Sequence, residues 1–168
     1  MRKLAIVTVS LLALLVLSST AYGEEARSFE ADLTGAQEVP PVTTETEGEI
    51  TVRFNRERTE AKFRLIVEDG VAVTMAHFHC APTGVNGPVV AFLFGNVPGG
   101  FDVDGRLAKF TLTDANITAV AANCVPTIGR QITNVADLAQ AMQEGLIYAN
   151  VHTVAHPSGE IRGQLKVD

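Results

Sequence analysis

Positive charge is scarce in this sequence. It has 13 Lys and Arg residues against 19 Asp and Glu residues, which gives a formal net charge of −6. Nucleic-acid binding needs a basic face that offsets the phosphates, so that class of function is disfavoured. The chain also has no polybasic run that would favour an anionic membrane. Cationic partners, metal ions among them, fit the charge.

Several motifs of catalysis are missing. We find no Ser/His/Asp order typical of hydrolases, no glycine-rich phosphate loop and no nucleophile elbow. Internal repeats and low-complexity tracts are missing as well. These absences favour a single domain that binds a ligand or partner over an enzyme.

Cysteine is limited to Cys80 and Cys124. In an exported protein, a pair of cysteines is most simply a disulfide. The alternative is a free thiolate that acts as a metal ligand. In a strand, Cys80 shares a face with Phe78 and not with the neighbouring histidines, which favours the disulfide.

The beginning of the chain has the pattern of a secretory signal peptide. Two basic residues precede an apolar run over residues 4–17, and an Ala-Tyr-Gly cleavage site follows at 21–23. The run is shorter than the roughly 20 residues that a membrane span needs. We therefore predict a signal peptide over residues 1–23, one domain over residues 24–168, secreted or periplasmic localisation, and no membrane anchor after cleavage.

Most of the remaining chain alternates apolar and polar residues with a period of two, which is typical of half-buried antiparallel strands. The segment PVVAFLF is apolar throughout, so we expect it to be buried on both faces. Asp69-Gly70 is expected to be a turn. The predicted strands cover residues 29–35, 49–55, 61–69, 74–80, 88–94, 106–113, 146–153 and 160–167.

One segment has helical spacing instead. Val135, Leu138 and Met142 recur at the period of a helix, Asn134 can cap its start and Gly145 suits its end. This predicts one short helix over about residues 134–145. Many short strands and one helix predict an all-β fold, an antiparallel Greek-key-like β-sandwich.

The segment MAHFHC carries two of the four histidines in the chain. In a strand, His77 and His79 share one face while Phe78 faces the core, so the imidazoles are expected to point outward. In YANVHT, the same alternation places Tyr148, Asn150 and His152 outward. If the two strands are neighbours, three imidazoles converge, and neutral imidazole is the usual ligand of copper and zinc.

The other polar residues near these histidines have simpler interpretations. Glu38 is either a solvated loop carboxylate or a partner of the histidines, and Glu160 with Arg162 is expected to form a structural ion pair. His156 lies beside a proline in a predicted turn and is expected to be solvated. The histidines themselves could be surface or hydrogen-bonding residues without a metal.

Four segments in this order resemble the CHRD domain, a family named for the extracellular protein chordin: LTGAQEVPPV, AHFHCAPTGVNGPVV, GLIYANVHT and PSGEIRGQL. The resemblance implies a secreted, mostly β domain. Chordin binds growth factors, but a single domain does not inherit that role. The family signatures carry over at His77, His79, His152, Glu38, Asn150, Glu160 and Arg162. A looser likeness to Cu/Zn superoxide dismutase concerns geometry only, because four histidines are too few for its two-metal site.

The leading hypothesis is a non-enzymatic exported binding domain with a surface metal site made by His77, His79 and His152. Glu38 or Asn150 is a candidate fourth or supporting group, copper is the preferred ion and zinc the alternative. The second hypothesis is a metal-free domain that binds an extracytoplasmic protein, and the third is a dismutase-like copper enzyme.

The metal site requires histidine nitrogens within roughly 6 Å of one another, because metal–nitrogen bonds are about 2.0–2.1 Å long. Unperturbed imidazole titrates near about 6.5, so binding is expected to weaken below about pH 6.

Overall fold

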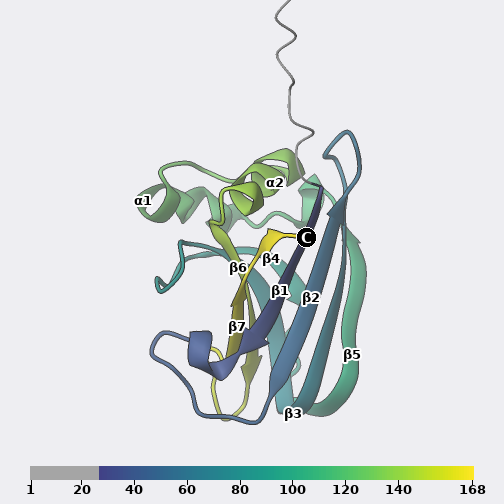
Figure 1. The fold of residues 1–168 in the computed structure, drawn as a ribbon, viewed down its shortest axis with the longest axis vertical. Helices are drawn as coiled ribbons and strands as arrows, with labels where there is room; N and C mark the ends of the chain where they lie inside the picture. The colour runs from purple at the N-terminus through teal and green to yellow at the C-terminus, as the bar shows by residue number, and fades with distance from the viewer. Residues whose placement is uncertain (1–26) are drawn as a thin grey trace, which may run out of the picture.

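One strand, β3 (Ala61–Cys80), runs through both halves of the fold (Figure 1). The computed structural model describes residues 27–168, and the predicted signal peptide lies outside them. The other strands are β1 (Ser28–Thr34), β2 (Glu47–Phe54), β4 (Val89–Phe94), β5 (Phe101–Leu112), β6 (Ile147–Thr153), β7 (Ile161–Gln164) and β8 (Lys166–Val167).

The strands form one antiparallel system that closes on itself. Its order is β2-β1-β7-β6-β3-β4, and a further pairing of β2 with β3 completes the ring. The first half of β3 lies between β2 and β5, and its second half lies between β6 and β4. Two layers therefore share β3 and form a barrel-like sandwich. The predicted all-β fold class is confirmed.

The predicted turn at Asp69-Gly70 is wrong, because strand β3 continues through this pair. Asp69 and Ala72 instead adopt positive φ angles of 52° and 50°, and the pairing with β5 shifts register around Gly70. Bulges of this kind bend a strand and increase its twist without ending it. Here they turn β3 from one layer of the sandwich into the other.

The alternating apolar residues form the core between the layers, as predicted. Phe78 is fully buried and packs edge-to-face on Phe63, with 6.4 Å between ring centroids. Phe29 and Phe54 form a second such pair at 5.7 Å. The expectation that residues 88–94 are buried on both faces is wrong, because the Phe92 side chain is 50% exposed.

The predicted helix is confirmed as α2 (Val135–Gln143). The Asn134 side chain caps it by accepting a hydrogen bond from the backbone N–H of Asp137 at 2.8 Å. The apolar side of α2 is buried. The sequence did not predict a four-residue helix, α1 (Val125–Ile128), or three 3₁₀ turns. Elements this short have too few turns to show a helical period. Both helices lie at one end of the molecule (Figure 1).

The predicted disulfide between Cys80 and Cys124 is confirmed, and both residues are fully buried. It joins the end of β3 to the 3₁₀ turn before α1. Neither sulfur is therefore free to bind a metal as a thiolate. Within residues 27–168, no helix has the length and apolarity needed to cross a bilayer.

Replacing both cysteines tests the contribution of this disulfide to stability. The bridged residues are 44 apart in sequence, and the chain-entropy model gives about 4 kcal/mol for a loop of that size. We expect Cys80→Ala/Cys124→Ala to lower the free energy of unfolding in urea by about that amount. The reduced parent protein is the matched control. Reactive thiols in the unfolded, unreduced parent would show that the bridge does not form.

Candidate functional site

The strand register assembles a row of polar residues on the outer face of one layer. His77 of β3 lies opposite Asn150 of β6, which in turn lies opposite Arg162 of β7. In the next row, His79 lies opposite Tyr148. His152 lies two residues beyond Asn150 on the same face of β6, since side chains alternate along a strand.

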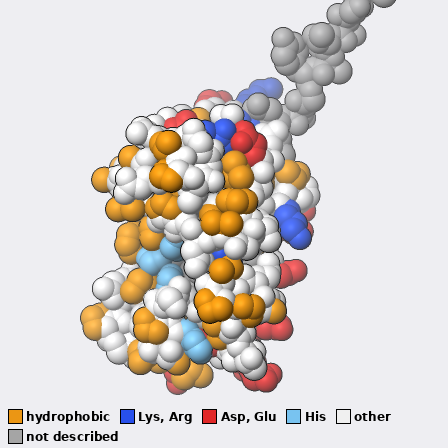
Figure 2. Space-filling model, turned by 90° about the vertical axis from the view of Figure 1, so that its left-hand side faces the viewer, with side chains coloured by type: hydrophobic (Ala, Val, Ile, Leu, Met, Phe, Trp, Pro, Cys, Tyr) orange, Lys and Arg blue, Asp and Glu red, His pale blue; other side chains and the backbone are white. Residues whose placement is uncertain are grey.

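The prediction that these histidines lie at the surface is wrong, because all three are buried. His77, His79 and His152 are only 4%, 9% and 6% exposed. The alternation gave the correct face of each strand, but loops cover that face. Histidine atoms are nevertheless visible from outside on the face shown in Figure 2, among hydrophobic side chains.

The three imidazoles are close enough to share one ion. One ligand nitrogen from each of His77, His79 and His152 lies within 4.8 Å of the other two, which meets the distance requirement set from the sequence. His77 Nδ1 and His152 Nε2 are 3.1 Å apart.

Backbone carbonyls fix two of the rings. His79 Nδ1 lies 2.9 Å from the carbonyl oxygen of Gly87, and His152 Nδ1 lies 3.0 Å from that of Pro157. Each Nδ1 must carry the hydrogen that it donates, so each Nε2 keeps its lone pair. Metal-binding histidines are commonly oriented in this way.

Two ring nitrogens in the cluster have no partner. With the His152 tautomer fixed, His77 Nδ1 donates to His152 Nε2, which leaves a lone pair on His77 Nε2. Both His77 Nε2 and His79 Nε2 are buried without a hydrogen bond. A buried polar atom without a partner costs about 1–3 kcal/mol, so two in one cluster point to a ligand that satisfies them.

Burial keeps all three imidazoles neutral. It lowers the pKa of His77 to about 3, helped by the nearby His152 and His79. It lowers the pKa of His79 to about 4, against the opposing effect of the hydrogen bond to Gly87. Burial also lowers the pKa of His152. Because protons compete weakly for nitrogens with such low pKa values, we expect metal affinity to fall only at a pH lower than the value of about 6 predicted from the sequence.

Arg162 holds the covering loop in place. Its guanidinium stacks on Tyr148, 3.5 Å from the ring centroid, and Tyr148 stacks on His79 with an angle of 8° between the ring planes. The same guanidinium donates to the carbonyl of Val85 and to the side chain of Asn86. The loop fixed in this way carries the Gly87 carbonyl that orients His79.

Glu38 is buried rather than solvated, at 5% exposure. Its Oε2 accepts a hydrogen bond from Asn150 Nδ2 at 3.4 Å, while Oε1 and Asn150 Oδ1 have no partner. Burial raises the pKa of Glu38 to about 7, although the positive charge of Arg162 opposes the shift. Glu38 does not belong to the group of atoms within 4.8 Å that the three histidines form. Asn150 brings its amide next to that group, because it pairs with His77.

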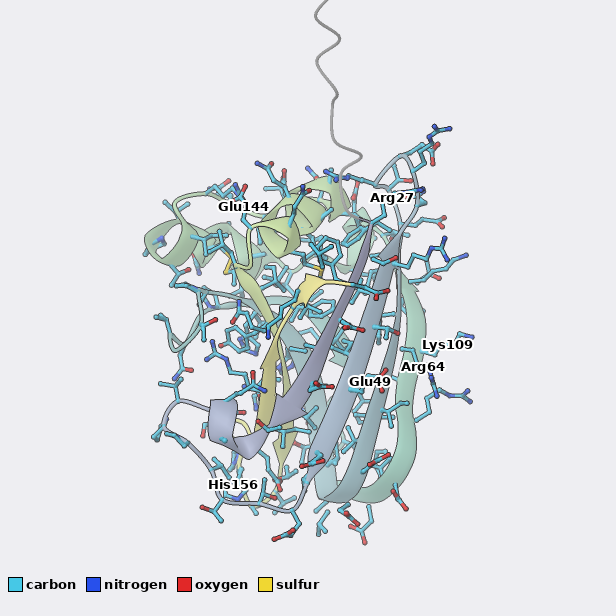
Figure 3. The ribbon with its side chains drawn as sticks, viewed as in Figure 1. Arg27, Glu49, Arg64, Lys109, Glu144 and His156 are labelled. Atoms are coloured by element: carbon cyan, nitrogen blue, oxygen red, sulfur yellow. A yellow bond between two sulfur atoms is a disulfide. The ribbon has the colours of Figure 1, made fainter. Side chains whose placement is uncertain are left out.

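The expected ion pair between Glu160 and Arg162 does not form. Glu160 accepts hydrogen bonds from the Thr44 and Thr46 hydroxyls at 2.6 and 2.8 Å. Burial would raise the pKa of Glu160, but hydrogen bonds from threonine side chains outweigh it and lower the value. His156 lies outside the histidine cluster, near the end of the molecule away from the helices (Figure 3).

The sequence did not point to Gly87, Phe92 or Tyr148 as parts of the site. Phe92 packs edge-on against His77 with 4.4 Å between ring centroids. Tyr148 shares the alternation of Asn150 and His152, which is a signal that could have found it. No pattern in the neighbouring sequence points to Gly87. A glycine is needed there because the Cys80 backbone leaves no room for a Cβ.

Together, the fold and the cluster define a small all-β domain that encloses a three-histidine group. The family model of the CHRD domain matches residues 29–165, so the chain belongs to the CHRD domain family. Comparisons with curated proteins and with solved structures give no match.

Gly87→Ala tests the loop that orients His79. A Cβ at this position would overlap the Cys80 carbonyl, a backbone atom that cannot move aside cheaply. We expect the variant to lose about 2 kcal/mol of stability in urea and to lose the fixed His79 tautomer in imidazole ¹⁵N NMR spectra. Gly95→Ala is the matched control, since no atom lies within 4 Å of its Cβ. Equal effects at both glycines would contradict this account of the loop.

The pH dependence of stability tests the shifted pKa values of the buried histidines and of Glu38. Unfolded histidine titrates near about 6.5, above the pKa of about 3 and 4 for His77 and His79. As pH falls below about 6.5, the unfolded chain therefore binds more protons than the folded chain, and each group lowers stability by about 1.4 kcal/mol per pH unit. Glu38 acts in the opposite sense between about pH 7 and its ordinary value of 4.5, because its folded pKa is raised.

Glu38→Gln removes this compensation. We expect its free energy of unfolding to fall more steeply than that of the parent from about pH 6.5 to 4.5, by roughly 1 kcal/mol per pH unit. Urea unfolding at several pH values measures the slope. Glu57→Gln, in an exposed turn, is the matched control. Parallel curves for Glu38→Gln and the parent would show that the Glu38 pKa is not raised.

Proposed function

We propose that this CHRD domain binds a transition-metal ion through His77, His79 and His152. The observation that carries the proposal is the pair of buried, unpartnered imidazole nitrogens inside a cluster whose ligand atoms lie within 4.8 Å. Family membership fits a small non-enzymatic domain. We therefore propose a binding role for the site, without catalysis.

Copper is the preferred ion, with zinc as the alternative. Imidazole nitrogen suits both metals, and a site of nitrogen ligands binds copper(II) more tightly than zinc(II) in the order of divalent ions. The rings enter as neutral ligands, so binding requires little deprotonation. Asn150 and Glu38 are the proposed supporting groups, because they lie hydrogen-bonded beside the cluster.

We propose that the domain works outside the cytoplasm, in the periplasm or the extracellular medium. The Cys80–Cys124 disulfide fits an oxidising compartment. The predicted signal peptide over residues 1–23 supports the same localisation. Partners are accordingly a metal ion or another extracytoplasmic protein.

Histidine substitutions test the site. We expect His77→Ala, His79→Ala and His152→Ala each to weaken copper(II) binding by at least about 100-fold, because each removes one of three ligands. Isothermal calorimetry with copper(II) and zinc(II) measures affinity, and electron paramagnetic resonance of the copper(II) form reports nitrogen ligands. The Cys80–Cys124 bridge is kept in all variants so that no thiol competes for the metal.

His156→Ala is the matched control, because it removes an imidazole outside the cluster. We expect it to bind metal like the parent. Circular dichroism and urea unfolding establish that each variant is folded before binding is compared. If all four folded variants bind copper(II) and zinc(II) like the parent, the cluster is not a metal site and the domain is better interpreted as a protein-interaction module.

A further inference from the structure

The opposite layer of the sandwich has an exposed face on which most charges are separated into two blocks. Glu30 and Arg106 are exposed on the same face, opposite Thr51 and Ile66, and do not follow this separation. The basic block consists of Arg53, Lys62, Arg64 and Lys109, and the acidic block consists of Asp32, Glu47, Glu49 and Glu68. These residues alternate with core residues on β1, β2, β3 and β5, and all eight are exposed. The helices leave this face uncovered, and Arg64 and Lys109 project from it side by side (Figure 3).

Like charges face each other directly across the strands. Arg53 is the partner of Lys62, and Arg64 is the partner of Lys109. In the acidic block, Asp32 is the partner of Glu49, and Glu47 is the partner of Glu68. Directly opposed like charges destabilise a sheet, whereas opposite charges would stabilise it. The stability of the single chain therefore gives no reason for this arrangement.

The basic residues are also free of internal neutralisation. Within residues 27–168, none of these four side chains forms an ion pair or a hydrogen bond. They line a shallow hollow of about 300 Å³, and Asp32 and Glu49 line another of about 600 Å³. Basic residues predominate in the first hollow, which Asp168 also lines, and acidic residues predominate in the second, which Lys166 also lines.

We propose that this face binds a second copy of the chain, with each basic block lying on the acidic block of the other copy. A two-fold axis that lies between the blocks, parallel to the sheet, brings both pairs of blocks together at once. An isologous contact of this kind uses all eight charges of the two blocks. An extended polyanion would meet the acidic block as well as the basic one, so it fits the face less well.

The contact is expected to be weak and sensitive to salt. Four strands about 4.8 Å apart and about 27 Å long give a face of roughly 500 Å² per copy, below the roughly 800 Å² of a standard interface. Two chains with a net charge of −6 also repel each other at long range. Attraction between the blocks acts only at contact, because salt screens charges beyond about 10 Å at 0.1 M.

Sedimentation equilibrium of the folded protein at concentrations up to about 1 mM tests the proposal. We expect a reversible monomer–dimer equilibrium whose association constant falls about tenfold between roughly 50 and 500 mM NaCl. Arg64→Glu is expected to weaken association about tenfold. Arg56→Glu makes the same change of charge in an exposed turn outside the face, and we expect little effect.

Paired reversals make the test specific to the two blocks. Arg64→Glu/Lys109→Glu and Asp32→Lys/Glu49→Lys each replace one like-charge pair by another, so the cross-strand repulsion within the sheet is preserved. We expect each double variant alone to be monomeric. An equimolar mixture of the two is expected to dimerise at least as tightly as the parent, because an acidic face then meets a basic face.

Two results would overturn the proposal. One is a parent protein that stays monomeric at every concentration and salt. The other is a mixture of the double variants that does not associate. Binding of the monomeric parent to an anionic polysaccharide such as heparin, lost in Arg64→Glu/Lys109→Glu, would instead assign the basic block to a polyanion and also overturn self-association.

Discussion

The continuity of β3 through the bend at Asp69–Ala72 is the constraint on which the rest of the structure depends. Because one strand serves both layers, its outward residues meet two different environments. In the first half, Lys62 and Arg64 face solvent on an exposed face of the sheet. In the second half, His77 and His79 face outward from the core but lie beneath loops. The bulges at the bend let a single alternating pattern supply both an exposed charged face and a buried polar one.

The buried polar face is costly, and the structure meets most of that cost with backbone hydrogen bonds. Arg162 is nearly inaccessible, yet it donates to loop carbonyls and stacks on Tyr148. Two histidines donate to carbonyls in the same manner. The unsatisfied atoms are therefore informative, and two of them are imidazole nitrogens, His77 Nε2 and His79 Nε2, while Glu38 Oε1 and Asn150 Oδ1 lie beside them. The proposed metal site accounts for these imidazole nitrogens, because its neutral rings are already oriented to act as ligands.

The alternation of apolar and polar residues was enough to predict the all-β class and the faces of His77, His79 and His152. Helical spacing predicted the helix capped by Asn134. The alternation could not predict burial of the histidines, because a period of two identifies the two faces of a strand without showing what covers each. Loops supply the cover, and Arg162 holds one of them by donating to the Val85 carbonyl, 77 positions away in sequence. Asp69-Gly70 was misleading for a similar reason, because a residue pair that favours turns also suits a bulge.

The two layers use electrostatics in opposite ways, which makes their proposed roles physically separable. At the histidine cluster, the groups are neutral and buried, so salt has little to screen. On the face with Arg64 and Lys109, the charges are full and exposed, so their interactions depend strongly on ionic strength. The link between them is β3 itself, whose residues 62–64 and 77–79 lie on either side of the bend. Coupling of metal binding to self-association would require that bend to have two arrangements, and β2, β5 and β6 hydrogen-bond the strand along both sides. A strand held in this way favours independent sites over an allosteric pair.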